Sequence, residues 1–256
     1  MIDSFPETIK KLINGKDFYS EGIGRSGSDI YVFTDSVLKV ENSGPSSDNE
    51  HYILKTLDGI LPVPKIRAFD KKDGKNYLLM SKLTGEMACS KKHISSPKET
   101  VLALADGLML LWNVDISALS LPDGDKNDLD AARKRIDEGG ISAHIDGIGN
   151  EEKIYEYLVS NKPSGDMVFS HGDYCLPNVF IENGKVSGFL DLGSAGLSSK
   201  WRDIECCLWS MHYNFCELSM MPEEEMREYE KLFFDRLGME KDEKMIFYYS
   251  AFSALF

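Results

Sequence analysis

The 256-residue sequence lacks any apolar run that approaches the roughly 20 residues needed to span a bilayer. Its first residues contain neither the basic region nor the apolar region of a signal peptide. The five cysteines are odd in number and lack the spacing of metal ligands, so we expect reduced thiols. Together these absences predict a cytoplasmic protein that does not cross a membrane.

An excess of positive charge is also missing. The chain has 29 Lys and Arg against 42 Asp and Glu, which gives a net charge of −13. Nucleic acids and anionic membranes are therefore expected to be poor partners. A polycationic small molecule would be attracted, although an acidic surface that merely keeps the chain soluble explains the charge equally well. Nothing in the sequence indicates an obligate protein partner.

The bulk composition is that of a globular protein, with 42% hydrophobic and 28% charged residues. The length allows a sizeable core in one large domain or in two lobes. No internal repeat and no low-complexity segment is present.

The most informative feature is a run of polar residues in the second half of the chain. Residues 171–178 read H-G-D-x-x-x-x-N, and Asp191 follows between two leucines. Phosphoryl transfer from ATP uses an Asp to receive or orient the acceptor hydroxyl, and an Asn with a second Asp to hold Mg²⁺ on the phosphates. The order and spacing match the catalytic loop of protein kinases, H-R-D-x-x-x-x-N, with Gly172 in place of Arg.

The residues around this motif predict a hairpin. Two short alternating runs flank Asn183 and Gly184, and Asn-Gly between such runs is a strong hairpin signal. Asn178 would then open one strand and Asp191 would end its partner, which places both at the same end of the hairpin. Oxygen ligands in this arrangement suit Mg²⁺. The alternative is that Asp173 and Asn178 are turn residues and that Asp191 caps a helix.

The N-terminal part alternates in the manner of strands, after a short helix over residues 3–14. Residues 21–28, between the first two strand-like pieces, are rich in Gly and Ser, whose backbone N–H groups can approach phosphates. We expect Ser26 and Ser28 to contact a nucleotide there. No Walker A motif is present, and the same residues also fit a plain hairpin turn.

Lys39 lies among strand-forming residues and resembles the lysine that contacts the α- and β-phosphates of ATP in kinases. An exposed strand lysine is the alternative. A helix is expected to begin at Ser47, and Glu50 on it would pair with Lys39. Ser47 and Glu50 also have the spacing of a capping box, in which Glu50 would bond only the Ser47 N–H. We favour the ion pair because the order of Lys39 and Glu50 fits the whole set.

A hinge is expected over residues 80–85, which leave the last strand of a predicted hairpin. Backbone groups there, at Met80 and Lys82, could bond the adenine edge. This division predicts an N-terminal nucleotide-binding lobe over residues 1–83 and a C-terminal catalytic and substrate-binding lobe over residues 84–256.

The second lobe is expected to be mostly helical. Helices are predicted over residues 96–112, 151–158, 222–237 and 241–256, and in a long stretch from Trp201. Residues 121–150, which are rich in Gly and Asp, are expected to be irregular and to face the substrate. Trp201 and Trp209 are expected to anchor the core.

Several segments resemble the aminoglycoside 3′-phosphotransferases. They are residues 61–65, 78–81, 168–173 with Asn178, 185–193, 200–204 and 234–238, and the final Leu255 and Phe256. The resemblance extends from about residue 20 to the end. It implies an α+β fold of the bilobal protein-kinase-like kind, with an N-terminal antiparallel sheet, a helix C and a mainly helical C-terminal lobe. It also implies ATP, Mg²⁺ and transfer of the γ-phosphoryl group to an aminoglycoside hydroxyl, expected to be the 3′-OH, which confers antibiotic resistance.

Carried over by position, the resemblance makes Asp173 the catalytic base and makes Asn178 and Asp191 the Mg²⁺ ligands. Lys39 becomes the phosphate-binding lysine and Glu50 its partner.

The sequence departs from the family pattern near the expected acceptor site. Acidic residues often precede the C-terminal Phe of the family, where this chain has Ser253 and Ala254, and Ser194 stands where an Arg commonly follows D-L-G. We therefore expect other carboxylates to hold the cationic acceptor: Asp137, Glu138, Asp146 and the α-carboxylate of Phe256. The alternative is a kinase of the same fold acting on another hydroxyl compound, such as a choline-like molecule, an amino sugar or a peptide antibiotic.

Overall fold

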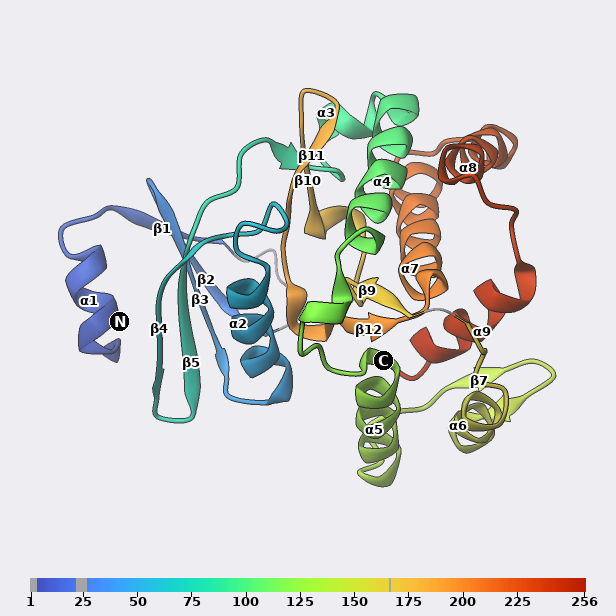
Figure 1. Ribbon diagram of the computed structural model, residues 1–256, viewed down its shortest axis with the longest axis horizontal. Coiled ribbons are helices and arrows are strands. Elements are labelled where there is room, and N and C mark those ends of the chain that lie inside the picture. The colour runs from blue at the N-terminus through green and yellow to red at the C-terminus, as the bar shows by residue number, and fades with distance from the viewer. Residues whose placement is uncertain (1–3, 22–26, 166) are drawn as a thin grey trace.

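The computed structural model describes residues 4–21, 27–165 and 167–256. Its N-terminal part is a five-stranded antiparallel sheet with the strand order β1-β2-β3-β5-β4. The strands are β1 (Phe18–Glu21), β2 (Asp29–Phe33), β3 (Ser36–Asn42), β4 (Ile66–Lys72) and β5 (Lys75–Ser81). Helices α1 (Glu7–Ile13) and α2 (Pro45–Leu57) accompany this sheet (Figure 1).

Alternation along the strands gives the sheet two different faces. On one face Leu38 and Leu79 pack with Ile9 of α1 in an apolar cluster. On the other face Leu78 packs with residues of α2 and of the C-terminal part. Because successive side chains of a strand point to opposite faces, Lys39 shares the face of α2.

The C-terminal part is mainly helical (Figure 1). Its helices include α3 (Lys91–Ile94), α4 (Pro97–Trp112), α5 (Gly124–Asp137), α6 (Glu151–Ser160), α7 (Lys200–His212), α8 (Glu223–Leu237) and α9 (Glu243–Ser253). A π-helical segment, Tyr213–Leu218, continues α7, and 3₁₀ turns lie at Ile116–Ala118, Leu176–Asn178 and Leu192–Ser194. The antiparallel sheet and the many helices make the fold α+β, as the sequence predicted.

Short strands connect the helices and position the polar motif. A three-stranded sheet has the order β11-β10-β6, and two pairs, β12 with β9 and β7 with β8, stand apart. These strands are β6 (Glu86–Met87), β7 (His144–Ile145), β8 (Gly149–Asn150), β9 (Val168–Ser170), β10 (Val179–Glu182), β11 (Lys185–Phe189) and β12 (Gly196–Ser198).

Helix α4 lies in the centre of the C-terminal core. Its fully buried side chains recur at helical spacing, at Val101, Leu104, Leu108 and Leu111. A Cβ at Gly107 would lie 2.2 Å from the hydroxyl of Tyr174, which donates a hydrogen bond to the Leu104 carbonyl at 2.8 Å. The glycine thus lets the catalytic-loop segment pack against α4. None of the helices in the described ranges has both the length and the apolar character of a membrane crossing.

The helix expected to begin at Ser47 begins at Pro45, with Gly44 as its N-cap. Proline suits the first helical position because its φ is preset and no N–H is left without a partner. Ser47 lies in the first turn, where its hydroxyl accepts a hydrogen bond from the Gly44 N–H at 3.0 Å. The alternative in which Glu50 bonds the Ser47 N–H is therefore wrong.

The expectation that residues 121–150 are irregular is also wrong, because they contain the 14-residue helix α5. Asp123 caps this helix by accepting a hydrogen bond from the Lys126 N–H at 3.0 Å. Leu129, Ala132 and Ile136, at helical spacing, pack with α6 and α9. The many Asp and Lys residues obscured this narrow apolar stripe.

Trp209 is not a core anchor. Its side chain is 57% exposed and stacks on Tyr213, with ring centroids 5.5 Å apart. The buried face of α7 is formed by Ile204, Cys207 and Met211, and position 209 lies outside that face. Trp201 does pack in the core, against Phe234.

Candidate active site

The polar motif lies in a loop between β9 and the 3₁₀ turn Leu176–Asn178, and a carboxylate of α7 holds this loop. Asp203, which is fully buried, accepts hydrogen bonds from the N–H groups of His171 and Gly172, both at 2.9 Å, and from the Ser170 hydroxyl at 3.0 Å. Burial raises the pKa of Asp203, while His171, Arg202 and the backbone donors oppose the rise. Asp203 thus fixes the backbone that carries Asp173.

Gly172 has a local structural reason to replace the Arg of protein kinases. Its φ is +83°, in the left-handed region that favours glycine. A Cβ at this position would lie 2.2 Å from the carbonyl oxygen of Ser194. The loop therefore approaches the segment after Asp191 too closely for any side chain at residue 172.

The Asp173 carboxylate is oriented by two neutral groups. Its Oδ2 accepts a hydrogen bond from Asn178 Nδ2 at 2.9 Å, and its Oδ1 accepts one from the Cys206 thiol at 3.5 Å. Asn178 also donates to the Asp173 carbonyl at 3.0 Å. The neighbouring Cys175 is no nucleophile, because burial raises the pKa of its thiol.

The hairpin predicted around Asn183 and Gly184 is present, with β10 and β11 as its strands and positive φ at both turn residues. At its open end the Leu190 N–H donates to the Asn178 carbonyl at 2.8 Å. Asn178 and Asp191 therefore lie at the same end, as predicted. Asp191 has φ 56° and ψ 61°, and its side chain is 41% exposed.

Lys39 joins the sheet to this end of the hairpin. Its Nζ lies 2.8 Å from Glu50 Oε2, 3.0 Å from Asp191 Oδ1 and 3.6 Å from Glu41 Oε2. Burial would lower the pKa of Lys39, but the surrounding carboxylates outweigh it and raise the pKa, so the side chain is an ammonium. Burial raises the pKa of Glu50, and the Lys39 ammonium opposes this rise. The expected Lys39–Glu50 ion pair is present.

Four other residues were expected to contact the nucleotide: Ser26, Ser28, Met80 and Lys82. Ser26 lies outside the described residues, and Ser28 donates a hydrogen bond to Glu41 at 3.3 Å. Met80 is buried inside β5, between its partners Val37 and Ile66. Lys82 follows the end of β5 and is exposed. A contact of these residues with nucleotide stays a prediction.

A cavity of about 270 Å³ opens beside Asp173. Its charged lining residues are Asp125 and Asp128 of α5, Asp173, and Arg202 and Glu205 of α7. Gly172, Ser194, Cys206 and Ser253 also line it, with an aromatic wall of Tyr249, Phe252 and Phe256. Four carboxylates against one guanidinium make the cavity suited to a cation.

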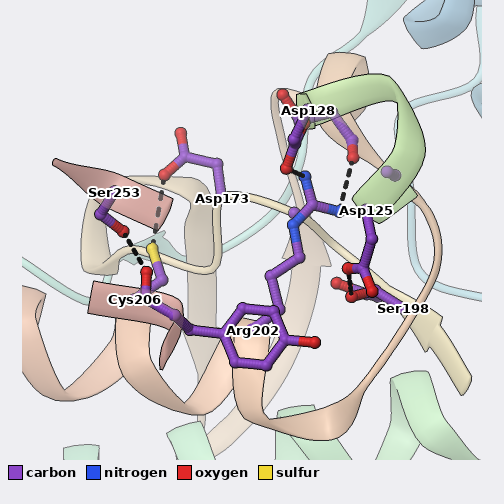
Figure 2. Close-up of polar contacts among 12 residues, drawn as sticks. Asp125, Asp128, Asp173, Ser198, Arg202, Cys206 and Ser253 are labelled. Carbon is purple, nitrogen blue, oxygen red and sulfur yellow. Dashed lines mark hydrogen bonds and ion pairs between the residues drawn. The ribbon is translucent and has the colours of Figure 1, made fainter. Parts of the chain in front are cut away.

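The two sides of the cavity differ (Figure 2). On one side Arg202 pairs with Asp128 and donates to the Ser194 carbonyl at 3.1 Å. Asp125 accepts from the Ser198 hydroxyl and lies 3.6 Å from Lys162 Nζ. Burial raises the pKa of Asp128 to about 6, an effect that Arg202 opposes. Figure 2 shows Asp173, Cys206 and Ser253 grouped on the other side.

The carboxylates expected to hold the acceptor lie elsewhere. Asp137 pairs with Arg133 at 2.7 Å, Glu138 lies 3.8 Å from Lys134, and Asp146 is fully exposed beside His144 at 3.5 Å. None of the three is among the residues that line the cavity. The reason is α5: Asp137 and Glu138 end it, whereas the cavity lies at its beginning.

Phe256 does line the cavity, as expected. Its main-chain oxygen accepts a hydrogen bond from Arg135 at 3.0 Å, and the Arg135 guanidinium lies 5.4 Å from the centre of its ring. A cationic partner for this oxygen was not foreseen from the sequence.

Sequence reasoning missed five charged residues of the site: Asp125, Asp128, Arg202, Asp203 and Glu205. The first two belong to the segment predicted to face the substrate, which lines the cavity through these carboxylates and not through Asp137, Glu138 or Asp146. Asp203 and Glu205 follow Arg202 on α7. The sequence alone does not show which of these side chains points to the loop and which to the cavity.

Potential metal ligands also gather at the end of α7. His212, Cys216 and Glu223 bring their ligand atoms within 4.8 Å of one another. His212 Nε2 lies 2.7 Å from Glu223 Oε1. These residues are not part of the cavity lining beside Asp173.

The chain is similar to known proteins over most of its length. A family model described as a phosphotransferase enzyme family matches residues 22–236. The chain is 32% identical to aminoglycoside 3′-phosphotransferases of Enterococcus faecalis and Staphylococcus aureus, over 97% of this chain and 97% of each relative. It is 31% identical to the aminoglycoside 3′-phosphotransferase of Niallia circulans, over 96% of this chain and 95% of the relative.

Solved structures show the same fold. The crystal structure of an aminoglycoside 3′-phosphotransferase of type VIII superposes with a TM-score of 0.82 at 18% identity, covering 100% of this chain and 99% of that one. An aminoglycoside phosphotransferase of Streptomyces rimosus, in complex with ADP and streptomycin, has a TM-score of 0.75 at 16% identity, with coverage of 98% and 99%.

Proposed function

Because the chain belongs to the phosphotransferase enzyme family, we propose that it transfers the γ-phosphoryl group of ATP to a hydroxyl of an aminoglycoside, the 3′-hydroxyl being expected, and so confers resistance. The observation that carries the proposal is the acidic cavity beside Asp173. Aminoglycosides are polycations, and the four carboxylates of the cavity, Asp173 among them, would attract and orient them.

We place the nucleotide between the N-terminal sheet and the hairpin of β10 and β11, in a bilobal arrangement with its boundary near residue 83. Lys39 would contact the phosphates, with Glu50 holding its ammonium in position at 2.8 Å. The glycine-rich segment of residues 21–28 was expected to cover the phosphates, but residues 22–26 lie outside the described residues.

Asn178 and Asp191 fit a magnesium ion. Both side-chain hydrogen bonds of Asn178 use its amide nitrogen, which leaves its amide oxygen available. The Asp191 carboxylate, at the same end of the hairpin, is partly exposed. Oxygen donors of this kind are the ligands that Mg²⁺ prefers. A bound Mg²⁺ supplies charge neutralisation on the transferring phosphoryl group.

Asp173 would orient the acceptor hydroxyl and accept its proton as the hydroxyl oxygen attacks the γ-phosphorus. The new P–O bond forms while the bond to the β-phosphate oxygen breaks and ADP leaves. Asn178 and Cys206 hold the carboxylate through neutral hydrogen bonds, and no basic side chain of the described ranges forms an ion pair with it.

A direct test incubates the purified enzyme with Mg-ATP and a panel of aminoglycosides, choline-like compounds, amino sugars and peptide antibiotics, with mass detection of phosphorylated products. We expect a gain of one phosphoryl group on kanamycin-like compounds, and NMR places it on the 3′-oxygen. Phosphorylation of another compound, with no aminoglycoside modified, would replace the proposed acceptor while leaving the kinase chemistry in place.

A further inference from the structure

The four carboxylates of the cavity are not equivalent. Asp125 and Asp128 each have a cationic neighbour, Lys162 and Arg202 respectively. Within the part of the chain that the structure describes, neither Asp173 nor Glu205 forms an ion pair with a basic side chain. Asp173 has a role as the proposed base. Glu205 has no such role in the proposed reaction. Its lack of an ion pair among the described residues therefore needs another explanation.

Glu205 is nearly as buried as a core residue, with 7% of its surface exposed. Its Oε2 accepts a hydrogen bond from the Ser253 hydroxyl at 3.0 Å. Burial raises the pKa of the Glu205 carboxyl, and Ser253 opposes the rise. Burying a carboxylate against a single hydroxyl costs free energy, whereas buried charges in proteins are normally paired. The cavity leaves room for a cationic partner that the described part of the chain does not provide.

The position of Glu205 on α7 ties it to the reacting group. The next residue, Cys206, donates its thiol hydrogen bond to Asp173 Oδ1 at 3.5 Å, and both side chains line the cavity. A ligand bound at Glu205 would therefore be a neighbour of the hydroxyl held at Asp173.

Helix α9 completes this side of the cavity. Tyr249 and Phe252 stack with ring centroids 6.1 Å apart and planes inclined by 16°, and both line the cavity together with Ser253. Aromatic faces of this kind accept the apolar face of a sugar ring and attract a cation. Carboxylate, hydroxyl and aromatic wall together suit an amino sugar.

We propose that Glu205, with Ser253 as its hydrogen-bond partner, binds an ammonium group of the acceptor next to the hydroxyl that is phosphorylated. The inference rests on the proposed function, which it extends by naming the specificity-determining carboxylate. It assigns the recognised group as a primary ammonium on a sugar ring, adjacent to the aromatic wall of Tyr249 and Phe252.

The first test uses Glu205→Gln, which keeps the shape and removes the charge, with Glu228→Gln on the exposed surface of α8 as the matched loss of charge. For Glu205→Gln we expect the KM of neamine to rise roughly 10- to 100-fold with kcat changed by less than about threefold. The KM of ATP should stay as in the wild type. Glu228→Gln should leave all three values unchanged.

Stability separates this binding role from a structural one. Because the free protein buries the Glu205 charge without a cation, Glu205→Gln should melt at the wild-type temperature or higher while binding amines more weakly. A variant that melts lower and keeps its amine affinity would overturn the inference. Ser253→Ala, which deletes only the hydroxyl, serves if Glu205→Gln does not fold. It should raise the KM of neamine about threefold to tenfold, and an unchanged KM would count against the proposal.

Calorimetry without turnover distinguishes the inference from the proposed function. The dissociation constant of neamine should rise roughly 10- to 100-fold in Glu205→Gln. If that rise is seen while no aminoglycoside is phosphorylated, the proposed function fails and the ammonium site stands. If aminoglycosides are phosphorylated but their KM and dissociation constants do not depend on Glu205, the inference fails and the proposed function stands.

Discussion

Asp173 is held by hydrogen bonds from Asn178 and Cys206, and among the described residues no basic side chain pairs with it, so its charge would be available to an acceptor hydroxyl. Asp173→Asn removes the proton acceptor but keeps the shape of the loop and the nucleotide site. We expect turnover to fall by about 10²- to 10⁴-fold with ATP affinity unchanged. Steady-state kinetics and nucleotide calorimetry measure both, with Asp137→Asn as the surface control. Turnover near wild type would remove Asp173 from its assigned role.

Asp191 and Asn178 would contribute unequally to metal binding, because only Asp191 brings a full charge. Asp191→Ala should lower Mg²⁺-dependent transfer more than Asn178→Ala does. The same change takes one of the carboxylates away from Lys39, at 3.0 Å, so the apparent affinity for Mg-ATP should also fall. A magnesium titration of both variants gives the comparison, and equal or reversed effects would contradict the ligand assignment.

Burial raises the pKa of Asp128 to about 6, and we expect acceptor binding to depend on pH for this reason. Above pH 6 the carboxylate is ionised and balances Arg202. As the pH falls through 6 it takes up a proton, Arg202 is left uncompensated, and a cationic acceptor is repelled. We expect the acceptor KM to rise about threefold to tenfold between about pH 7.5 and pH 5.5.

Asp128→Asn provides the check on this pH dependence. In this variant the acceptor KM should be high at both pH values. It should therefore rise much less between about pH 7.5 and pH 5.5 than the KM of the wild type does. A variant with the wild-type pH profile would show that another group titrates.

At the scale of elements, α7 both holds the catalytic loop and forms one wall of the cavity. Arg202, Glu205 and Cys206 reach the cavity, while Asp203 points to the backbone of the loop. One helix can do this because residues three and four positions apart share a face, whereas neighbouring residues point in different directions. Its placement therefore sets the distance between the base and the acceptor site.

Asp203→Asn should disturb this arrangement strongly, since one of the three donors would face an amide N–H in place of an oxygen. We expect the free energy of unfolding to fall by about 2–4 kcal/mol and turnover to fall with it. Urea unfolding followed by circular dichroism measures the stability. Ser170→Ala, which removes only the hydroxyl donor, should cost about 1 kcal/mol. Equal stabilities of Asp203→Asn and wild type would rule out the anchoring role.

At the scale of the whole molecule, α2 connects the sheet to the catalytic region. Asn49 donates hydrogen bonds to the carbonyls of Gly193 and Ala195, both at 2.9 Å. The Lys39–Asp191 ion pair spans the same junction. The apolar cluster that contains Leu78 of β5 and Leu104 of α4 also runs across it. The N-terminal sheet and the C-terminal part are thus joined by polar and apolar contacts together.

The net charge of −13 acts on the two substrates in opposite directions. A cationic acceptor is attracted and anionic ATP is repelled, and salt screens both effects. Raising the salt concentration from about 0.05 to 0.3 M should lower kcat/KM for the acceptor severalfold, with no such loss for ATP. Parallel salt series with each substrate varied in turn measure this, and a matching decline for both would exclude steering by net charge.

The sequence by itself determined the chemistry-bearing set. The spacing of Asp173, Asn178 and Asp191, the Asn-Gly turn between the last two, and the Lys39–Glu50 pair could all be predicted. Each depends on local geometry: a tight turn fixes which hairpin ends meet, and a strand's alternation fixes which face a side chain takes. The resemblance to the aminoglycoside 3′-phosphotransferases depended on the same local motifs.

Only the tertiary structure decided which carboxylates face the acceptor cavity. Asp137, Glu138 and Asp146 were predicted from their position in an acidic segment, but Asp128 and Glu205 line the cavity instead. The direction of a helical side chain depends on where its helix begins and on how its apolar stripe packs. The start of each helix is capped locally, by Asp123 and Ser199, but the packing of α5 and α7 was set by contacts with distant helices, so no local pattern could select among their many charged residues.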